Sequence, residues 1–239
     1  MKTVVIFGGS GFIGKNIIRR LAKKDYHIFV PYQRSITYEA KLKLFGNLGQ
    51  IVPLRFNHIG ENLIQNIVQE SDIIINLKTI WKEKKSYSYR NNILNFNTQL
   101  VDLINSIDNK KPLIFFSGLG VSEISSSKRS QFIAKTEQYI IQNILNTAII
   151  RPSVVIGEGD QLLGKLLPLF KLSFFIPLFG SGKQKLQPVY VDDVAKAVEN
   201  ILELGLKNQN IYELGGQEIF TYESLYKFII DCLRIKRIF

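Results

Sequence analysis

The chain has 239 residues, with 31 Lys and Arg against 20 Asp and Glu and a formal net charge of +11. At about 150 residues per domain, this length excludes two full-sized independent domains. A content of 46% hydrophobic and 11% aromatic residues allows a sizeable core and excludes a disordered or collagen-like chain. The positive charge favours anionic partners, such as a phosphorylated cofactor, an acidic lipid surface or nucleic acid, without choosing among them.

The chain lacks the patterns of disulfide-rich, metal-binding and membrane-spanning proteins. Cys232 is the only cysteine, and with His27 and His58 as the only histidines we expect neither a disulfide framework nor a metal site. The N-terminal MKTVVIF reads as a strand and not as a signal peptide. The most apolar segment, residues 162–180, contains lysines and prolines and is not expected to cross a bilayer. We therefore expect a reducing, cytoplasmic compartment.

Short β-branched runs alternate with longer stretches of helical period, which is typical of a parallel sheet with crossover helices. The predicted strands are Thr3–Phe7, His27–Tyr32, Ile51–Leu54, Asp72–Leu77, Leu113–Ser117, Ala148–Arg151, Pro188–Val191 and Asn210–Leu214. The predicted helices are Phe12–Lys23, Glu39–Phe45, Glu61–Gln69, Tyr89–Ser106, Lys128–Leu145, Asp192–Leu204 and Tyr222–Leu233. Strands such as DIIINL and PLIFF are apolar at consecutive positions, which indicates helices on both faces. The prediction is an α/β fold with a doubly wound parallel sheet of the Rossmann type.

We divide the chain into a dinucleotide-binding core over residues 1–155 and a C-terminal portion over residues 156–239 that serves a substrate or a partner. The two are expected to interleave as one structural unit. The basic run KEKK at residues 82–85 predicts a solvated loop. Phenylalanines mixed with lysines over residues 162–179 predict a docking surface for a membrane or a protein, or a lid that packs its aromatics inward.

A glycine-rich loop, GGSGFIG, stands between the first strand and the first helix. Gly8 permits a tight turn, Gly11 lets a pyrophosphate approach the backbone, and Gly14 lets the helix pack closely on the strand. The helix N-terminus offers free N–H groups to the phosphates. A phosphate-binding P-loop is a weaker interpretation, because Asn16 replaces the hydroxyl residue that binds Mg²⁺. A tight turn without a ligand is the remaining alternative.

The residues after the second strand distinguish the two nicotinamide dinucleotides. NAD is normally held by an acidic residue there, which accepts from the ribose 2′-OH, yet residues 26–38 contain no Asp or Glu. Arg34 and Lys15 stand where a 2′-phosphate would lie, so we expect NADP(H) to be favoured, with NAD(H) possible. Arg34 as an ordinary solvated side chain is the alternative.

Several segments together resemble a known family. They are GGSGFIG, the strand end INL, the FSG segment, RPSVVIG at residues 151–157, QPVYVDDVA at residues 187–195 and YELGG at residues 212–216. This set resembles the atypical short-chain dehydrogenase/reductases, the NAD-dependent epimerase/dehydratase-like proteins. PYQRS at residues 31–35 and GNLGQIVPL at residues 46–54 are similar to the accessory NADP(H)-binding subunits of respiratory complex I and their bacterial relatives. Members of that group continue well past YELGG, so a short C-terminal portion is expected.

The resemblance implies roles for individual residues. Ser117 and Gly118 would lie beside the nicotinamide, and Lys135 would hold the ribose hydroxyls. Gly157 and residues 187–193 would shape the floor of the cleft, although Gln187 and Asp193 also suit a helix cap. The full expected set of dinucleotide contacts is Gly8, Ser10, Gly11, Phe12, Ile13, Gly14, Lys15, Tyr32, Arg34, Asn57, Leu77, Ser117, Gly118, Lys135, Pro152, Ser153 and Val154.

The chain departs from the family at the proton donor. Active members use a YxxxK pair, but four residues before Lys135 stands Gln131, whose amide cannot act as a general acid. Ser117 and Lys135 are thus the remaining catalytic candidates, and Tyr139, one turn after Lys135, is a possible substitute acid.

Three functions remain open. The first is a non-catalytic NADP(H)-binding protein associated with respiratory complex I or peripheral on the inner face of a respiratory membrane. The second is an active NAD(P)-dependent oxidoreductase or epimerase, and the third is an NADP(H)-sensing regulator. Nucleic acid is not an expected partner, because no recognised binding motif or aromatic stacking platform is present. The missing tyrosine favours the first and third functions, and the resemblance to the complex I subunit favours the first.

Overall fold

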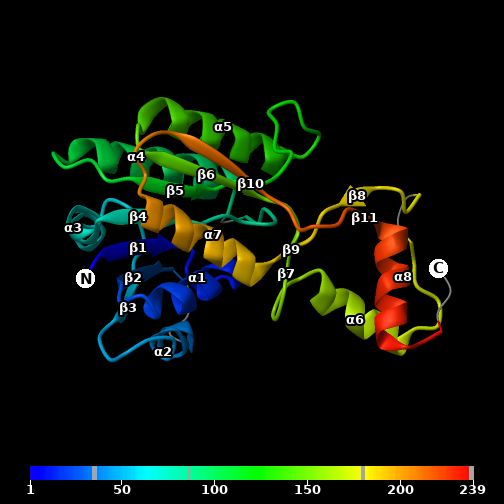
Figure 1. The fold of residues 1–239 in the computed structure, drawn as a ribbon. Helices are drawn as coiled ribbons and strands as arrows, with labels where there is room; N and C mark the ends of the chain where they lie inside the picture. The colour runs from blue at the N-terminus through cyan, green and yellow to red at the C-terminus, as the bar shows by residue number, and fades with distance from the viewer. Residues whose placement is uncertain (34–36, 86, 179–180, 237–239) are drawn as a thin grey trace.

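The protein is described by a computed structural model that covers residues 1–33, 37–85, 87–178 and 181–236 (Figure 1). Its main sheet has seven parallel strands in the order β10-β6-β5-β4-β1-β2-β3. These strands are β1 Thr3–Phe7, β2 His27–Tyr32, β3 Ile51–Arg55, β4 Ile73–Asn76, β5 Leu113–Phe116, β6 Thr147–Pro152 and β10 Asn210–Leu214. The order reverses beside β1, which is the doubly wound arrangement that the sequence predicts, and this fold class is confirmed.

Helices cover both faces of the sheet, and the strands divide their side chains between them. In β1, Val4 and Ile6 join one buried cluster while Val5 and Phe7 join the other. The first cluster lies under α1 Phe12–Ala22, α2 Thr37–Lys43 and α7 Val191–Leu204. The second lies under α3 Asn62–Glu70, α4 Phe96–Ser106 and α5 Lys128–Asn143. Apolar residues at consecutive strand positions are therefore explained by burial on both faces.

Ion pairs attach α7, from the C-terminal half of the chain, to α1. Glu199 is buried and accepts from Arg20 and from Lys24, with 3.3 Å between the Lys24 Nζ and the carboxylate. Burial alone would raise the pKa of Glu199, but the hydrogen bonds from Arg20 and Lys24 outweigh it and hold the pKa below its usual value. Removing both cations would leave the buried Glu199 charge without a partner, so these contacts couple residues 191–204 to the core.

The remaining elements form a separate C-terminal lobe at the carboxyl edge of the sheet (Figure 1). The lobe consists of α6 Leu163–Leu172, β8 Lys185–Leu186, β11 Phe220–Thr221 and α8 Tyr222–Leu233. Phe170 and Tyr226 form its centre, with their rings 5.0 Å apart in an edge-to-face arrangement. A short pair, β7 Val155–Ile156 with β9 Val189–Tyr190, lies where the chain leaves the sheet. The division at residue 155 stays a prediction.

Several element boundaries differ from the sequence prediction. The predicted strand 188–191 is wrong as part of the main sheet, since only Val189–Tyr190 is extended and pairs with β7, and α7 begins at Val191. The predicted helix 89–106 begins as a π-helical segment, Arg90–Asn95, before α4. Helix α6 was not among the predicted elements, because Pro168 interrupts its pattern. No helix in the described ranges has the length and apolar character needed to span a bilayer.

Candidate functional site

The predicted contact residues lie at the carboxyl ends of six neighbouring strands. Residues 8–15 follow β1, and Asn57, Leu77 and Gly118 follow β3, β4 and β5 respectively. Tyr32 is the last residue of β2, Pro152 is the last residue of β6, and Ser153 and Val154 follow it. Parallel strands bring these positions to a single edge of the sheet, which is where ligands bind in open α/β folds. Arg34 lies outside the described residues.

Two glycines of the loop are required by the fold itself. Gly8 has a positive φ of +78°, and a Cβ there would stand 2.8 Å from the carbonyl carbon of Leu77. A Cβ on Gly14 would stand 2.6 Å from the Cα of Gly9. Any side chain at either position would therefore distort the junction of β1, β4 and α1.

Gly11 is different, because the space around it is open. Its backbone is extended, with φ −74° and ψ 175°, and it is exposed. A Cβ there would meet only the carbonyl oxygen of Gly8, at 3.2 Å. Gly11 is also the N-cap of α1, where no side-chain cap and no acidic residue in the first turn compete for the N–H groups. The open space above uncapped N–H groups fits a pyrophosphate.

The carboxylates near the end of β2 and β3 are already bonded. Glu39, one residue beyond the stretch without acids, accepts from the Tyr32 hydroxyl at 3.0 Å and pairs with Lys43 at 2.8 Å. The hydrogen bond from Lys43 and then that from Tyr32 lower the pKa of Glu39. Glu61 accepts from the backbone N–H of Asn57 at 2.8 Å. Glu39 is thus engaged by two side chains and Glu61 by the backbone of Asn57, and the preference for NADP(H) over NAD(H) stays a prediction.

After β5, the Ser117 hydroxyl oxygen is buried and makes no hydrogen bond with any described residue. Buried polar atoms normally have a partner, so this oxygen is suited to a hydrogen bond with a ligand. The Gln131 side chain donates to the carbonyl of Ser125 at 2.6 Å and thereby holds the loop after β5 against α5. Lys135 lies one turn further along α5 and is exposed. Their contacts with a dinucleotide stay a prediction.

Tyr139 is not at this site, and its role as a substitute acid is wrong. Its hydroxyl donates to Asp102 of α4 at 3.3 Å, and its ring packs against the core under α3, α4 and α5. Burial and the Asp102 carboxylate raise the pKa of Tyr139. Eight residues of helix separate it from Gln131, or about 12 Å along the axis, and α5 runs away from the carboxyl edge.

Lys78 is a residue of this site that sequence reasoning missed. Its Nζ lies 3.8 Å from the ring centre of Phe96 and 5.7 Å from that of Phe56, and burial lowers its pKa to about 8. Its backbone N–H donates to the Asn76 side chain at 2.9 Å. A Cβ on Gly8 would stand 2.9 Å from the Lys78 nitrogen, which places this residue beside the glycine loop. The sequence pattern that could have identified Lys78 was its position two residues after a buried strand.

We expect Lys78→Met to stabilise the ligand-free protein. Because the folded pKa lies below the unfolded value, the unfolded chain binds more protons between about pH 8 and 10.4, and wild-type stability rises across that window. Below pH 8 the full cost of the buried ammonium remains, on the order of 2 kcal/mol after discounting for partial exposure. Thermal unfolding at pH 7 should show a midpoint about 4–8 °C higher.

The matched control for this change is Lys82→Met, which removes an exposed lysine from the loop that follows. Its midpoint should stay within about 1 °C of wild type. A lower midpoint for Lys78→Met would mean that the ring of Phe96 stabilises the ammonium by more than burial destabilises it.

Arg129 is a second residue that the sequence did not single out. It is the second residue of α5, and its guanidinium reaches back to the segment after β4. The Nε donates to the carbonyl of Ile80 at 3.0 Å, and the guanidinium carbon lies 4.2 Å from the ring centre of Trp81. Burial lowers the pKa of Arg129. Only the tertiary contact between α5 and residues 79–81 brings this cation beside the segment that follows β4.

Comparison with known proteins gives both family and fold. A profile of the NAD dependent epimerase/dehydratase family matches residues 4–124 and 126–215. The mitochondrial NADH dehydrogenase (ubiquinone) 1 alpha subcomplex subunit 9 of Arabidopsis thaliana is 32% identical over 230 residues, which cover 96% of this chain and 57% of that protein. The subunit of the same name from Dictyostelium discoideum is 30% identical over 226 residues, which cover 95% and 62%. The chain spans less than two thirds of these relatives.

Solved structures with the same fold are more distant in sequence. MoeE5 in complex with UDP-glucuronic acid and NAD superposes with a TM-score of 0.81 at 14% identity, covering 98% of this chain and 83% of that one. UDP-glucuronic acid 4-epimerase from Bacillus cereus in complex with NAD gives 0.80 at 18% identity, with 99% and 87% covered. With the profile match over most of the length and the glycine loop at the switch point of the sheet, the chain belongs to the NAD dependent epimerase/dehydratase family.

Proposed function

We propose that this chain is a non-catalytic NADP(H)-binding protein, whose bound dinucleotide serves as a structural element. The observation that carries the proposal is Gln131. It occupies the position four residues before Lys135 where active relatives of the fold hold a tyrosine, and its amide is bonded to the Ser125 carbonyl. An amide does not titrate in the useful range, so it donates a hydrogen bond but delivers no proton.

The rest of the site supports cofactor binding without supporting turnover. When bound, the nicotinamide ring would supply hydride-transfer chemistry. Gly11 and the N-terminus of α1 would hold the pyrophosphate, and Ser117 and Lys135 would lie at the nicotinamide end. Tyr139, the single tyrosine of α5, donates its hydroxyl to Asp102. The chain thus retains the residues that would bind and orient a dinucleotide, while it lacks the tyrosine that would transfer a proton.

NADP(H) is expected to bind more tightly than NAD(H). Lys15 stands on the first turn of α1, Arg34 follows β2, and the nearby Glu39 is engaged by Tyr32 and Lys43. Charge-assisted contacts to a 2′-phosphate are worth roughly 1.5–3 kcal/mol, so the preference should be about tenfold or more. Calorimetric titration with NADPH and NADH measures it.

Lys15→Gln and Arg34→Gln should each remove part of this preference without changing NADH affinity. Lys23→Gln is the control, because it deletes a lysine at the far end of α1. Equal affinities of the wild-type protein for the two dinucleotides, or unchanged NADPH affinity in Arg34→Gln, would contradict the assignment.

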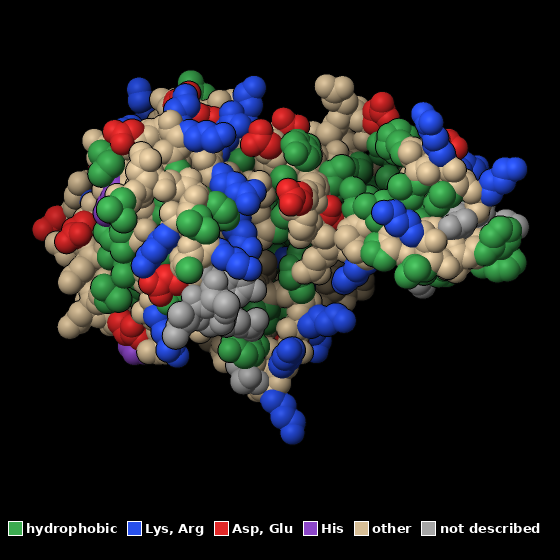
Figure 2. Space-filling view, turned by 90° about the horizontal axis from the view of Figure 1, so that it is seen from below, with side chains coloured by type: hydrophobic (Ala, Val, Ile, Leu, Met, Phe, Trp, Pro, Cys, Tyr) green, Lys and Arg blue, Asp and Glu red, His purple; other side chains and the backbone are tan. Residues whose placement is uncertain are grey.

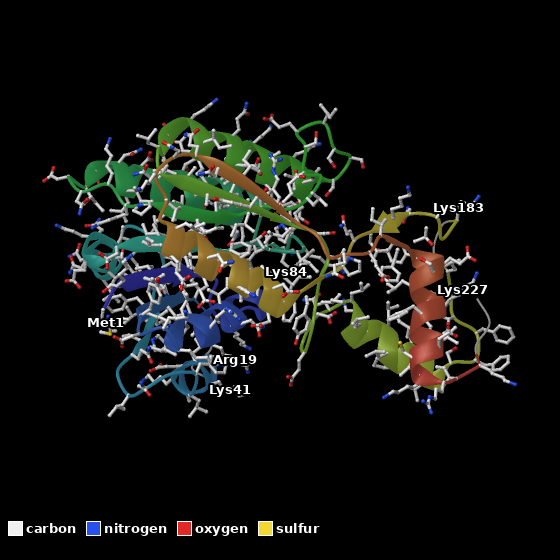
Figure 3. The ribbon with its side chains drawn as sticks, in the orientation of Figure 1. Met1, Arg19, Lys41, Lys84, Lys183 and Lys227 are labelled. Carbon is white, nitrogen blue, oxygen red and sulfur yellow. The ribbon has the colours of Figure 1, made fainter. Side chains whose placement is uncertain are left out.

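The proposed partner is respiratory complex I, with the protein peripheral on the inner face of a respiratory membrane. The relatives named as NADH dehydrogenase subunits support the first part. The C-terminal lobe supports the second, because Phe174 and Phe175 are 54% and 68% exposed beside an exposed Lys171. Hydrophobic side chains gather there among lysines and arginines (Figure 2), and Lys183 and Lys227 extend from the same lobe (Figure 3).

One part of the predicted docking surface is wrong. Phe170 points inward and is fully buried against Tyr226 in the centre of the lobe, so it cannot meet a membrane. Phe179 lies outside the described residues. The surface is therefore proposed on Leu172, Phe174 and Phe175, which are exposed.

The first experiment is nucleotide identification on the purified protein, followed by an assay of NADPH oxidation. Bound NADP(H) without turnover supports the proposal. Turnover would favour an active oxidoreductase or epimerase, and a dinucleotide-dependent change of partner binding would favour a sensing regulator.

A further inference from the structure

Arg129 ties the start of α5 to the segment that follows β4. Its Nε donates to the carbonyl of Ile80 at 3.0 Å, its Nη2 lies 3.4 Å from the Thr79 hydroxyl oxygen, and the plane of Trp81 stacks on it. Trp81 itself is 67% exposed. The guanidinium is therefore part-buried near the surface and not within the core.

The charge of Arg129 has no counter-charge in the described part of the chain. Arg20 and Arg151 are each paired with a buried glutamate, Glu199 and Glu137. No carboxylate lies within 4.0 Å of Arg129 among the described residues. The guanidinium is part-buried, and this burial lowers the pKa of Arg129. A desolvated cation without an anion is costly in free energy, and an incoming anion would relieve that cost.

A second unsatisfied polar group lies on the loop that packs on the same end of α5. The Ser117 hydroxyl oxygen is buried without a partner. The loop that follows it is held on α5 by a hydrogen bond from the Ser122 N–H to Ser130, at 3.1 Å, and by Gln131. The loop that begins after Ser117 and the guanidinium of Arg129 therefore both lie at the N-terminal end of α5.

We propose that Arg129 binds an oxyanion, the carboxylate or phosphate group of a small molecule, at the surface where the start of α5 meets residues 79–81. The planar guanidinium offers a second edge to such a group while its Nε edge stays on Ile80. The site goes beyond dinucleotide binding and needs no chemical step. The alternative is that Arg129 only holds α5 and residues 79–81 together and binds no ligand.

The chain carries its own reporter for the test. Trp81 is the only tryptophan of the sequence and stacks on Arg129, so an anion at the guanidinium should change its fluorescence. Malonate and inorganic phosphate are titrated separately into the full chain saturated with NADP⁺, with chloride at equal ionic strength as the blank. Saturating NADP⁺ keeps the probe anions away from the N-terminus of α1.

We expect a saturable change of Trp81 emission with at least one of the two anions, and the anion that acts identifies the carboxylate or the phosphate class. Calorimetry of Arg129→Gln should show at least tenfold weaker binding of that anion. Arg129→Lys keeps the positive charge but loses the planar guanidinium, so its affinity for the anion should lie between those of wild type and Arg129→Gln. Arg90→Gln, which removes an exposed arginine from the segment before α4, should bind like wild type.

Two outcomes would overturn the proposal. One is that neither anion changes the Trp81 fluorescence of the wild-type protein by more than the chloride blank does. Arg129 would then serve only to hold α5 against residues 79–81. The other is an Arg129→Gln protein that folds and binds the anion as wild type does. Repeating the titration on Gly11→Val, which closes the dinucleotide loop, separates this site from the proposed cofactor function, since the Trp81 response should persist there even if no dinucleotide binds.

Discussion

Gly11→Val should abolish dinucleotide binding while the ligand-free protein stays folded. The backbone at Gly11 is extended and suits any residue, and a new Cβ meets only the Gly8 carbonyl oxygen at 3.2 Å, which requires a shift of a few tenths of an ångström. The two added methyl groups occupy the space above the N-terminus of α1 that a pyrophosphate needs. Calorimetry with NADPH should show no measurable heat of binding, and thermal unfolding a midpoint within a few degrees of wild type.

Gly14→Val is the control that separates folding from binding. Its Cβ would stand 2.6 Å from the Cα of Gly9, and the clash involves only backbone atoms, so this variant should fail to fold or unfold far below wild type. If Gly11→Val kept wild-type affinity for NADPH, the loop would be a turn without a ligand. If Gly11→Val instead unfolded far below wild type, as we expect for Gly14→Val, then Gly11 would be required for folding.

Little or no dehydrogenase turnover is expected from the protein with its cofactor bound. Hydride transfer to a carbonyl builds negative charge on the oxygen, and a positioned acid accelerates this step by about 10² to 10⁴. Gln131 can stabilise that oxygen by a hydrogen bond but has no proton to give. NADPH oxidation with small carbonyls and quinones, followed at 340 nm, should stay near the uncatalysed rate.

Gln131→Tyr is the single change best placed to create activity, because it restores the phenol one turn before Lys135. The new side chain gives up the hydrogen bond to Ser125, so the loop after β5 must remain ordered without it. Lys135→Ala should weaken cofactor binding and leave the negligible rate unchanged. Tyr139→Phe should alter neither, since its hydroxyl faces Asp102. If the wild-type protein oxidised NADPH at an ordinary enzymatic rate, the proposal that it is non-catalytic would be wrong.

The strands and the glycine loop were predictable from the chain alone because their causes are local. Strands β1 and β2 and helix α8 have the predicted ends. The two strands are β-branched runs bounded by turns. Helix α8 begins at a capping pair formed by Thr221 and Ser224. The requirement for glycine at positions 8 and 14 likewise follows from their place between a strand and a helix. The solvated loop at residues 82–85 is confirmed by its exposure.

The character of the site depended on contacts between residues far apart in the sequence. Whether Tyr139 faced the cleft or α4 was decided by the packing of α5, and helical spacing alone could not choose between the two. Phe170 and Phe174 have the same local composition around them, yet one is buried by α8 and the other is exposed.

The electrostatics of the cleft were likewise a tertiary property. Lys78 acquires its lowered pKa because Phe56 and Phe96 exclude water from it, and these residues come from three different segments of the chain. Arg129 contacts Ile80 and Thr79, and no carboxylate among the described residues, because α5 carries it to residues 79–81. A charge pattern in sequence records which groups are present, whereas burial and pairing, which set their free energies, arise only when the sheet edge is assembled.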